Sequence, residues 1–411
     1  MVRVRIAPSP TGIPHIGNTR TALFNYLFAR HNKGKFILRI EDTDRKRIVK
    51  GAQEAIVEIL DFLGISPDET YTQSERIDEY KKYAKILLDK KLAYEKEGAV
   101  WMKIPQDQIF SWTDLVGNKS ISFKSQDIEE FVIIKSDGFP TYHLASVVDD
   151  HLMEISHVIR GDEWISSTPK HLLLYKSFSW ALPFFAHLPV ILGKDKKKLS
   201  KRDGAKSVLD YRNEGYLRNA LLNFMVLLGW NPGGDNEIFS ISEMIKLFDL
   251  KDVNTSSPVF DIQKLEWMNS VYIRKLAIID LKKEIEERFK DKLKNVSEEI
   301  LHSFLVLAQS RIKTLNEFYE LIKPFIEKLD FGLDGKEKNI GKKLLDGFLK
   351  ISNWRKDGIL TVMKKAMSQE NIRMPIVYKI LTGKESGLPL PESLEIVGKE
   401  KVIEMLKRLD V

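Results

Sequence analysis

The sequence contains no cysteine, which excludes disulfide bonds and zinc sites built from thiolates. Long apolar runs are also missing, and no stretch approaches the roughly 18 consecutive apolar residues that a membrane span requires. The segment from Met1 to Arg5 leads into prolines and not into an apolar run, so it does not resemble a secretory signal. We therefore expect a cytoplasmic protein with no membrane partner.

The histidines and acidic residues show no spacing typical of metal ligands. The nearest candidate is Asp149-Asp150-His151, which we interpret as a turn or a helix cap. We expect no metal site made of protein side chains.

Apolar residues and positive charge, in contrast, are plentiful. The 411 residues are 43% apolar, enough for the cores of about two to four domains. The formal net charge of +7 is compatible with a polyanionic partner. Between Lys194 and Lys206, seven of the thirteen residues are Lys or Arg, and Gly193 and Gly204 flank or interrupt the run. Such a segment is either a solvated loop or a loop that binds phosphate.

The first 44 residues predict a strand, a loop and a helix. Val2, Val4 and Ile6 alternate with Arg3 and Arg5, as in a strand. A loop follows because proline disfavours helical backbone at the residue before it and glycine leaves the backbone bare. The residues concerned are Pro8, Pro10, Gly12, Pro14 and Gly17. A helix N-terminus after such a loop is suited to binding an anion, although the spacing alone also fits an ordinary strand-to-helix turn.

Strands and helices continue to alternate along the chain. A strand over residues 35–40 ends in Glu41-Asp42-Thr43-Asp44, a helix over 52–63 ends at Gly64, and a third strand lies near Tyr71 before a helix over about 74–90. This order predicts an α/β fold with a doubly wound, parallel, Rossmann-type sheet. Ligands of such sheets lie beyond the carboxyl ends of the strands, where Ser9, His15 and Glu41 fall.

The alternation stops over residues 92–130, which we interpret as an inserted small α+β domain. The sheet resumes at residue 131, and a strand over 157–160 ends in Arg160-Gly161-Asp162-Glu163-Trp164. Helices follow the basic segment, including an apolar one over 220–228 that is too short to span a membrane. From residue 277 the pattern is amphipathic and helical, which predicts all-α C-terminal domains.

The motifs of this chain, taken in order, resemble those of a known family. They are Pro8-Ser9-Pro10-Thr11-Gly12, His15-Ile16-Gly17-Asn18, Arg39 to Asp44, Tyr142-His143, Arg160 to Trp164, Lys198-Leu199-Ser200-Lys201-Arg202 and Val259-Phe260-Asp261. In this order they are similar to class I aminoacyl-tRNA synthetases, specifically the bacterial type of glutamyl-tRNA synthetase. The resemblance covers about the first 275 residues, and beyond them it rests on Ile380-Leu381-Thr382-Gly383.

The resemblance implies four regions. Residues 1–91 and 131–193 would form the catalytic Rossmann-type domain, and residues 92–130 a shortened insertion that binds the acceptor end of tRNA. Residues 194–276 would form a helical domain that contacts the tRNA stem and carries the basic loop. Residues 277–411 would form the all-α anticodon-binding domain.

The chemistry implied by the family is the activation of an amino acid by ATP. The substrate carboxylate is already ionised at neutral pH, so catalysis consists of holding the reactants in line and neutralising phosphate charge. The resemblance assigns catalysis to His15, Gly17, Lys198, Ser200 and Lys201. It assigns ATP binding to His15, Gly17, Glu163, Trp164, Val190, Ile191 and Lys201. Asn18 occupies the place of a second histidine in the family signature, so we give His15 the greater weight.

Amino-acid selectivity concerns Arg5, whose charge lies in a strand that should be covered on both faces and therefore needs a partner. Glu41 could be that partner in a structural ion pair, or a bound glutamate could supply the carboxylate. The resemblance favours the second alternative. It implies a glutamate pocket made of Arg5, Ala7, Ser9, Glu41, Tyr142, Ser146 and Arg160.

The remaining expectations concern partners. The resemblance implies ATP with Mg²⁺ as substrate, L-glutamate and tRNA(Glu), with Thr43 and Asp44 near the tRNA acceptor end, and we expect a monomer. The insertion lacks the cysteines that some relatives use for zinc, so no zinc is expected. Two alternatives stay open: a glutaminyl or non-discriminating enzyme that also charges tRNA(Gln), and a tRNA-binding paralogue without catalysis.

Overall fold

The computed structural model describes residues 1–199, 205–328 and 331–408. The chain forms two compact units. The first contains Met1–Asn213 and Arg218–Leu265, and the second contains Glu214–Leu217 and the chain from Glu266 onward. The predicted site residues at Ser200 and Lys201 lie outside the described residues.

The first half of the parallel sheet is built from the N-terminal strands. β1 (Arg3–Ile6), β2 (Lys35–Ile40) and β3 (Glu69–Thr72) pair in parallel in this order. Arg5 lies opposite Ile37, and Ile37 lies opposite Glu69. The connecting helices are α1 (Ile16–His31) and α2 (Ala52–Leu63). α2 ends at Gly64, whose φ of 65° requires the left-handed region that glycine adopts freely, so the predicted end of this helix is confirmed.

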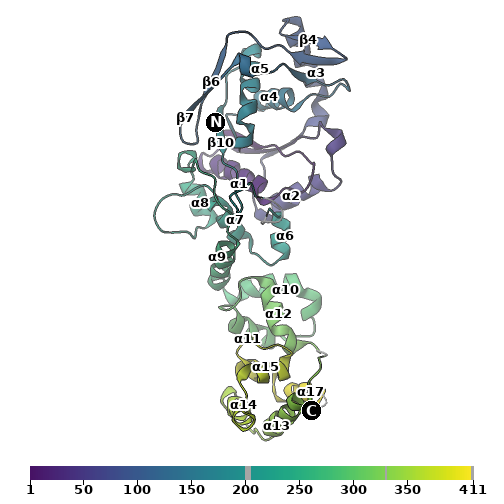
Figure 1. The fold of residues 1–411 in the computed structure, drawn as a ribbon, viewed down its shortest axis with the longest axis vertical. Coiled ribbons are helices and arrows are strands. Elements are labelled where there is room, and N and C mark those ends of the chain that lie inside the picture. The colour runs from purple at the N-terminus through teal and green to yellow at the C-terminus, as the bar shows by residue number, and fades with distance from the viewer. Residues whose placement is uncertain (200–204, 329–330, 409–411) are drawn as a thin grey trace. The chain divides into compact units, whose positions relative to one another are not determined.

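The second half of the sheet lies beside β1. β9 (His157–Gly161) pairs in parallel with β10 (Phe184–Leu188). Ser156, just before β9, donates its backbone N–H to the carbonyl of Arg3 at 2.9 Å, which joins the two halves. The helices of this region are α3 (Ile77–Asp89), α4 (Tyr142–Leu152) and α5 (Thr168–Phe178), shown with the strands in Figure 1. The carboxyl ends of β1, β2 and β9 therefore lie at one edge.

Residues 92–130 differ from the α+β domain expected of them. They form β4 (Ala93–Lys96), β5 (Ala99–Met102), β6 (Ile109–Asp114) and β7 (Lys119–Lys124), and their only helical piece is a 3₁₀ turn. β5 pairs with β8 (Phe131–Ile134), and β6 pairs with β10. The helical part of the prediction is wrong: the strands of this segment pair with strands outside it, and no α-helix of the segment covers them.

Short helices complete the first unit. They are α6 (Val208–Asn213), α7 (Arg218–Leu227) and α8 (Ile241–Leu247). α7 packs against α1 and is apolar on nearly all sides, as expected of a buried helix. Among the described residues, no helix is both long and apolar enough to cross a bilayer.

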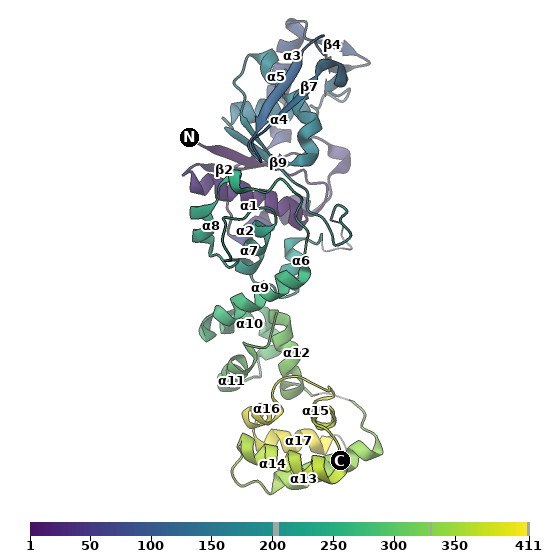
Figure 2. The same ribbon diagram turned by 60° about the vertical axis from the view of Figure 1, so that its left-hand side comes forward.

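The second unit contains helices and connecting turns, with no strand among its described residues. Its helices are α9 (Ile262–Lys275, entered from the first unit), α10 (Ile278–Leu293), α11 (Glu298–Ala308), α12 (Leu315–Ile326), α13 (Gly335–Leu349), α14 (Lys356–Glu370), α15 (Met374–Thr382), α16 (Leu390–Val397) and α17 (Lys399–Arg408). Figure 2 shows α13, α14, α16 and α17 grouped together, in agreement with their packing contacts. The all-α prediction for this region is confirmed.

Candidate active site

A cavity of about 870 Å³ lies at the carboxyl ends of the parallel strands. It is lined by nearly all of the predicted site residues that the structure describes: Arg5, Ala7, Ser9, His15, Gly17, Glu41, Thr43, Asp44, Tyr142, Arg160, Glu163, Trp164, Val190, Ile191 and Lys198. Segments far apart in the sequence thus meet where the sheet predicts a ligand site.

His15 forms the N-cap of α1. Its Nδ1 accepts hydrogen bonds from the backbone N–H groups of Gly17 at 3.0 Å and Asn18 at 3.4 Å. Burial, together with the charge of Lys198, lowers the pKa of His15 below its usual value. The ring is therefore neutral near pH 7, and because Nδ1 is the acceptor, its proton is on Nε2.

The residues around His15 explain two features of the motif. A Cβ on Gly17 would lie 2.8 Å from Cε1 of His15, so any larger residue there would displace the ring. The Asn18 side chain accepts from the backbone N–H of His15 at 3.3 Å, which closes a capping box. Asn18 thus holds the helix start rather than offering a second imidazole, in line with the greater weight given to His15.

The described ends of the basic loop are tied to the cavity. The N–H of Leu199 donates to the carbonyl of Ile191 at 2.9 Å, and the N–H of Ile16 donates to the carbonyl of Lys206 at 3.0 Å. Lys198 lines the cavity and acts electrostatically on His15. Lys198 is exposed and also lines the cavity, so its position is compatible with both the solvated-loop and the phosphate-binding alternatives.

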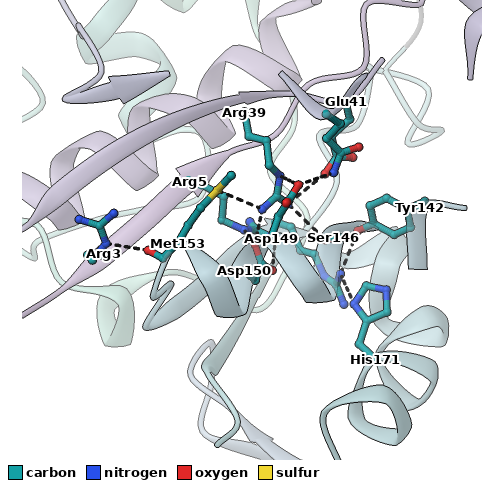
Figure 3. Close-up of polar contacts among 12 residues, drawn as sticks. Arg3, Arg5, Arg39, Glu41, Tyr142, Ser146, Asp149, Asp150, Met153 and His171 are labelled. Atoms are coloured by element: carbon teal, nitrogen blue, oxygen red, sulfur yellow. Dashed lines mark hydrogen bonds and ion pairs between the residues drawn. The ribbon is translucent and has the colours of Figure 1, made fainter. Parts of the chain in front are cut away.

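Arg5 has a partner that the sequence prediction did not consider (Figure 3). Its guanidinium binds both oxygens of Asp150, at 2.9 and 3.3 Å. Glu41, the expected structural partner, instead accepts from Arg39 at 3.0 Å. The reason is geometric: Arg39 and Glu41 are two residues apart at the end of β2, and such residues point to the same face of a strand.

Arg39 is the centre of this buried network. It is completely buried and also donates to Asp150 at 2.6 Å, while three carboxylates raise its pKa well above the ordinary value against the effect of burial. Burial raises the pKa of Glu41. Burial acts in the same direction on Asp150, but Arg5 and Arg39 outweigh it and lower the pKa of that carboxyl.

The segment Asp149-Asp150-His151 is not a turn or a helix cap, so that interpretation is wrong. It lies inside α4, where both aspartates are buried. Asp149 accepts from Tyr80 at 2.8 Å and from Arg76 at 2.8 Å. The aspartates are tolerated in the helix because each carboxylate meets charged or polar donors.

Ser146 is the described site residue that the structure places outside the cavity lining. It is buried, and its hydroxyl accepts from Arg39 at 3.3 Å (Figure 3). The structure therefore places Ser146 behind the cavity wall, in contact with Arg39.

Arg160 is buried, yet its charge is met by neutral acceptors. It donates to the hydroxyl of Tyr142 at 3.0 Å and to that of Thr168 at 2.8 Å, and further bonds reach Nε2 of His187, Nδ1 of His171 and the carbonyl of Trp164. No carboxylate among the described residues forms an ion pair with it. A buried cation that lines a cavity without an internal counter-charge is suited to bind an anionic ligand.

Apolar and aromatic groups line another part of the cavity. The rings of Tyr142 and Trp164 lie 4.4 Å apart between centroids, and Val190 and Ile191 line the same cavity. Trp164 is about a third exposed, so part of its surface is accessible to a ligand. This surface can hold a flat heterocycle.

The sequence also matches known families. Residues 1–99 and 95–267 match the family described as "tRNA synthetases class I (E and Q), catalytic domain", and residues 279–410 match the "Anticodon binding domain". The chain belongs to the class I tRNA synthetases (E and Q). The resemblance inferred from the motifs is confirmed, and ATP is a substrate of this synthetase.

Relatives of this synthetase align over almost its whole length. A glutamate–tRNA ligase of Dehalococcoides mccartyi is 40% identical over 98% of this chain and 96% of its own. One of Aquifex aeolicus is 38% identical over 99% of this chain and 98% of its own. A crystal structure of a glutamate tRNA ligase from Elizabethkingia meningosepticum, in complex with its amino acid, superposes with a TM-score of 0.83 at 31% identity and covers 99% of both chains.

Proposed function

We propose that this synthetase is a glutamate–tRNA ligase that activates L-glutamate with ATP and transfers it to the 3′-terminal adenosine of tRNA(Glu). The observation that carries the choice of amino acid is Arg160, a buried cation in the cavity whose described neighbours are all neutral. A substrate carboxylate that replaces a neutral acceptor there makes a charge-assisted bond, which is about twice as strong.

The charges of the pocket support an acidic substrate. Arg5 and Arg39 are matched by Glu41 and Asp150. These four charges sum to zero, so this group does not offset the positive charge of Arg160. Nη1 of Arg5 has no hydrogen bond among the described residues and can also reach a substrate oxygen, while Glu41 faces the cavity and suits the substrate ammonium. Ala7, Ser9 and Tyr142 complete the pocket, with Ser146 behind it.

Activation requires the α-carboxylate of glutamate to attack the α-phosphorus of ATP, with pyrophosphate leaving. No general base is needed, since the nucleophile is already ionised. We assign charge stabilisation to the Nε2–H of His15, the positive end of the α1 helix dipole and the ammonium of Lys198, with Ser200 and Lys201 belonging to the same loop. Glu163, Trp164, Val190 and Ile191 would surround the nucleoside.

Mg²⁺ is part of the substrate in this proposal. Among the residues that the structure describes, no three carboxylate or imidazole groups lie together as a metal site. The ion would therefore enter with the triphosphate and be coordinated mainly by phosphate oxygens and water.

The tRNA would extend from the cavity mouth. Thr43 and Asp44 line the cavity, and the exposed 3₁₀ turn Arg45–Arg47 follows directly. We assign the terminal adenosine to this region and keep the four-region division: 1–91 with 131–193, then 92–130, 194–276 and 277–411. The helical second unit would read the anticodon.

ATP–pyrophosphate exchange tests this proposal. We expect exchange with glutamate and not with glutamine, assayed with and without purified tRNA(Glu) and tRNA(Gln). Exchange driven by glutamine would favour a glutaminyl enzyme. Charging of both tRNAs with glutamate would favour a non-discriminating enzyme. Absence of exchange under every condition would favour a non-catalytic paralogue, against which His15, Gly17 and Lys198 together in one cavity already argue.

A further inference from the structure

A pair of buried residues lies behind Arg160, outside the lining of the cavity. Asp114 ends β6 in the 92–130 segment, and His187 lies on β10. Their side chains are joined by a hydrogen bond of 2.5 Å from Nδ1 of His187 to Oδ2 of Asp114. The other carboxylate oxygen accepts from the backbone N–H groups of His187 at 3.0 Å and Val116 at 3.1 Å. Asp114 therefore fixes both the backbone and the ring of His187.

This arrangement determines the tautomer of His187. Burial alone would raise the pKa of Asp114, but its hydrogen bonds and the nearby imidazole lower it, so the group is an ionised acceptor. Burial lowers the pKa of His187, so the ring is neutral near pH 7. With its single proton on Nδ1, the ring presents a lone pair at Nε2, which accepts from Nε of Arg160 at 3.2 Å.

We propose that Asp114 and His187 are positioning residues of the amino-acid pocket, which hold the Arg160 guanidinium toward the cavity by fixing the acceptor tautomer of His187. This inference rests on the proposed role of Arg160 in binding a substrate carboxylate. His187 supplies an acceptor without supplying a negative charge, since a carboxylate in direct contact would neutralise Arg160. Asp114 contributes its charge one ring further away.

On its opposite side, Arg160 also donates to a neutral histidine, but no carboxylate in the described part of the chain holds that histidine. His171 accepts from Arg160 at Nδ1, and its Nε2 lies 3.3 Å from Nδ1 of His143. Burial lowers the pKa values of both of these histidines, that of His143 to about 4. Of these histidines, only His187 is hydrogen-bonded to a buried carboxylate among the described contacts. A substitution of Asp114 can therefore change the tautomer of His187, and this makes the pair of Asp114 and His187 testable.

Asp114→Asn is the decisive variant. It keeps the side-chain shape and one oxygen for the two backbone N–H groups, but its amide nitrogen would donate to Nδ1 of His187. The ring would then carry its proton on Nε2, where it faces the Nε–H of Arg160. We expect the KM for glutamate in pyrophosphate exchange to rise about 10- to 100-fold, as for loss of a hydrogen bond to a charged group. The KM for ATP should not change.

Two further variants separate positioning from stability. Oδ2 of Asp114, which is bound to Nδ1 of His187, also accepts from Nε1 of Trp112 at 3.3 Å. Trp112→Phe removes this donor without affecting the tautomer of His187. It should lower stability but leave the KM for glutamate unchanged. The double variant Asp114→Asn, His187→Gln replaces the ring by an amide oxygen that accepts from Arg160 in any case, so it should recover most of the lost affinity.

The outcomes distinguish this inference from the proposed function. An unchanged KM for glutamate in Asp114→Asn, or no recovery in the double variant, would overturn the positioning role. If Asp114→Asn does not fold, the KM values for glutamate of His187→Gln and His187→Phe are compared instead. Only glutamine keeps an acceptor for Arg160, so a higher KM in His187→Phe alone would support the positioning role, and equal KM values would overturn it. Arg160→Gln is the separate control: an unchanged KM for glutamate in this variant would refute the assignment of Arg160 itself.

Discussion

Arg39→Met removes the cation at the centre of the buried network, and the structure predicts how much this costs. Arg39 is completely buried and donates to Glu41 at 3.0 Å and to Asp150 at 2.6 Å. Asp150 keeps Arg5 as a partner, whereas Glu41 loses the only ion pair it makes among the described residues. Removing one partner of a buried ion pair lowers the free energy of unfolding by about 3–5 kcal/mol.

The loss of stability should also depend on pH in a defined direction. Burial raises the pKa of Glu41 above its ordinary value of 4.5, and Arg39 opposes this shift, so the substitution raises the pKa further. Above pH 4.5, Glu41 then binds fewer protons in the unfolded chain than in the folded chain, so the contribution of Glu41 to stability falls as pH rises. The difference between wild type and Arg39→Met should therefore be small near the ordinary pKa and reach its full size at neutral pH.

Urea unfolding followed by tryptophan fluorescence is the appropriate assay. Five of the seven tryptophans belong to the first unit, so the signal reports mainly on the part that contains Arg39. The matched control is Arg3→Met, which breaks the partly exposed pair with Glu69 and should cost only about 1 kcal/mol. Equal losses in the two variants, or a deficit that shrinks as pH rises, would refute the reasoning.

Two further predictions concern the start of α1. Gly17→Ala places a Cβ 2.8 Å from the ring of His15, so the ring should leave its capping position. We expect a loss of about 1 kcal/mol in stability and a higher KM for ATP. Gly335→Ala, where a Cβ meets nothing within 4 Å, is the neutral control. The pKa of His15 is lowered by burial and by Lys198, so the folded state resists protonation. Stability should therefore decline as pH falls below 6.5, whereas exchange activity should decline only as pH falls through the lower pKa of the folded state. His15→Asn keeps a good N-cap without a titrating ring; it should retain stability, lose most exchange activity and show no acid decline in stability from this position, and a fully active variant would contradict the assigned role.

The local part of the fold could be predicted because it depends on periodicity and turn chemistry. The opening strand, the loop and α1 follow from alternating apolar residues and from prolines and glycines at fixed places. The end of α2 at Gly64 follows in the same way. Most of the described candidate site could be placed at the correct edge because parallel strands share that edge.

The long-range pairings could not be predicted in this way. Arg5 and Asp150 are 145 residues apart, and no local pattern joins them. One signal was nevertheless available. Arg39 lies in an apolar strand, so its buried charge needs a partner, as does that of Arg5. Likewise, the apolar residues around Asp149 and Asp150 indicated a buried helix.

The 92–130 segment shows a further limit of sequence patterns. Some partners of its strands are distant in the chain, since Asp114 on β6 lies opposite Phe185 on β10. A segment whose edges bond to the main sheet looks like an independent insertion when only its own residues are considered. The same pairing brings Asp114 against His187, so the tertiary contact that the sequence obscures is also the one that supports Arg160.

Arg5, Arg39 and Arg160 illustrate how burial and charge combine at this site. Arg5 and Arg39 lie on neighbouring strands with carboxylates in direct contact, and their charges are matched within the protein. Arg160 is equally buried, but hydroxyl, carbonyl and imidazole groups satisfy its N–H donors. Because hydrogen bonding alone does not neutralise a cation in a low-dielectric site, the potential of Arg160 remains directed into the cavity. An anionic side chain completes that arrangement and a neutral amide does not, which is the physical basis on which this pocket would prefer glutamate over glutamine.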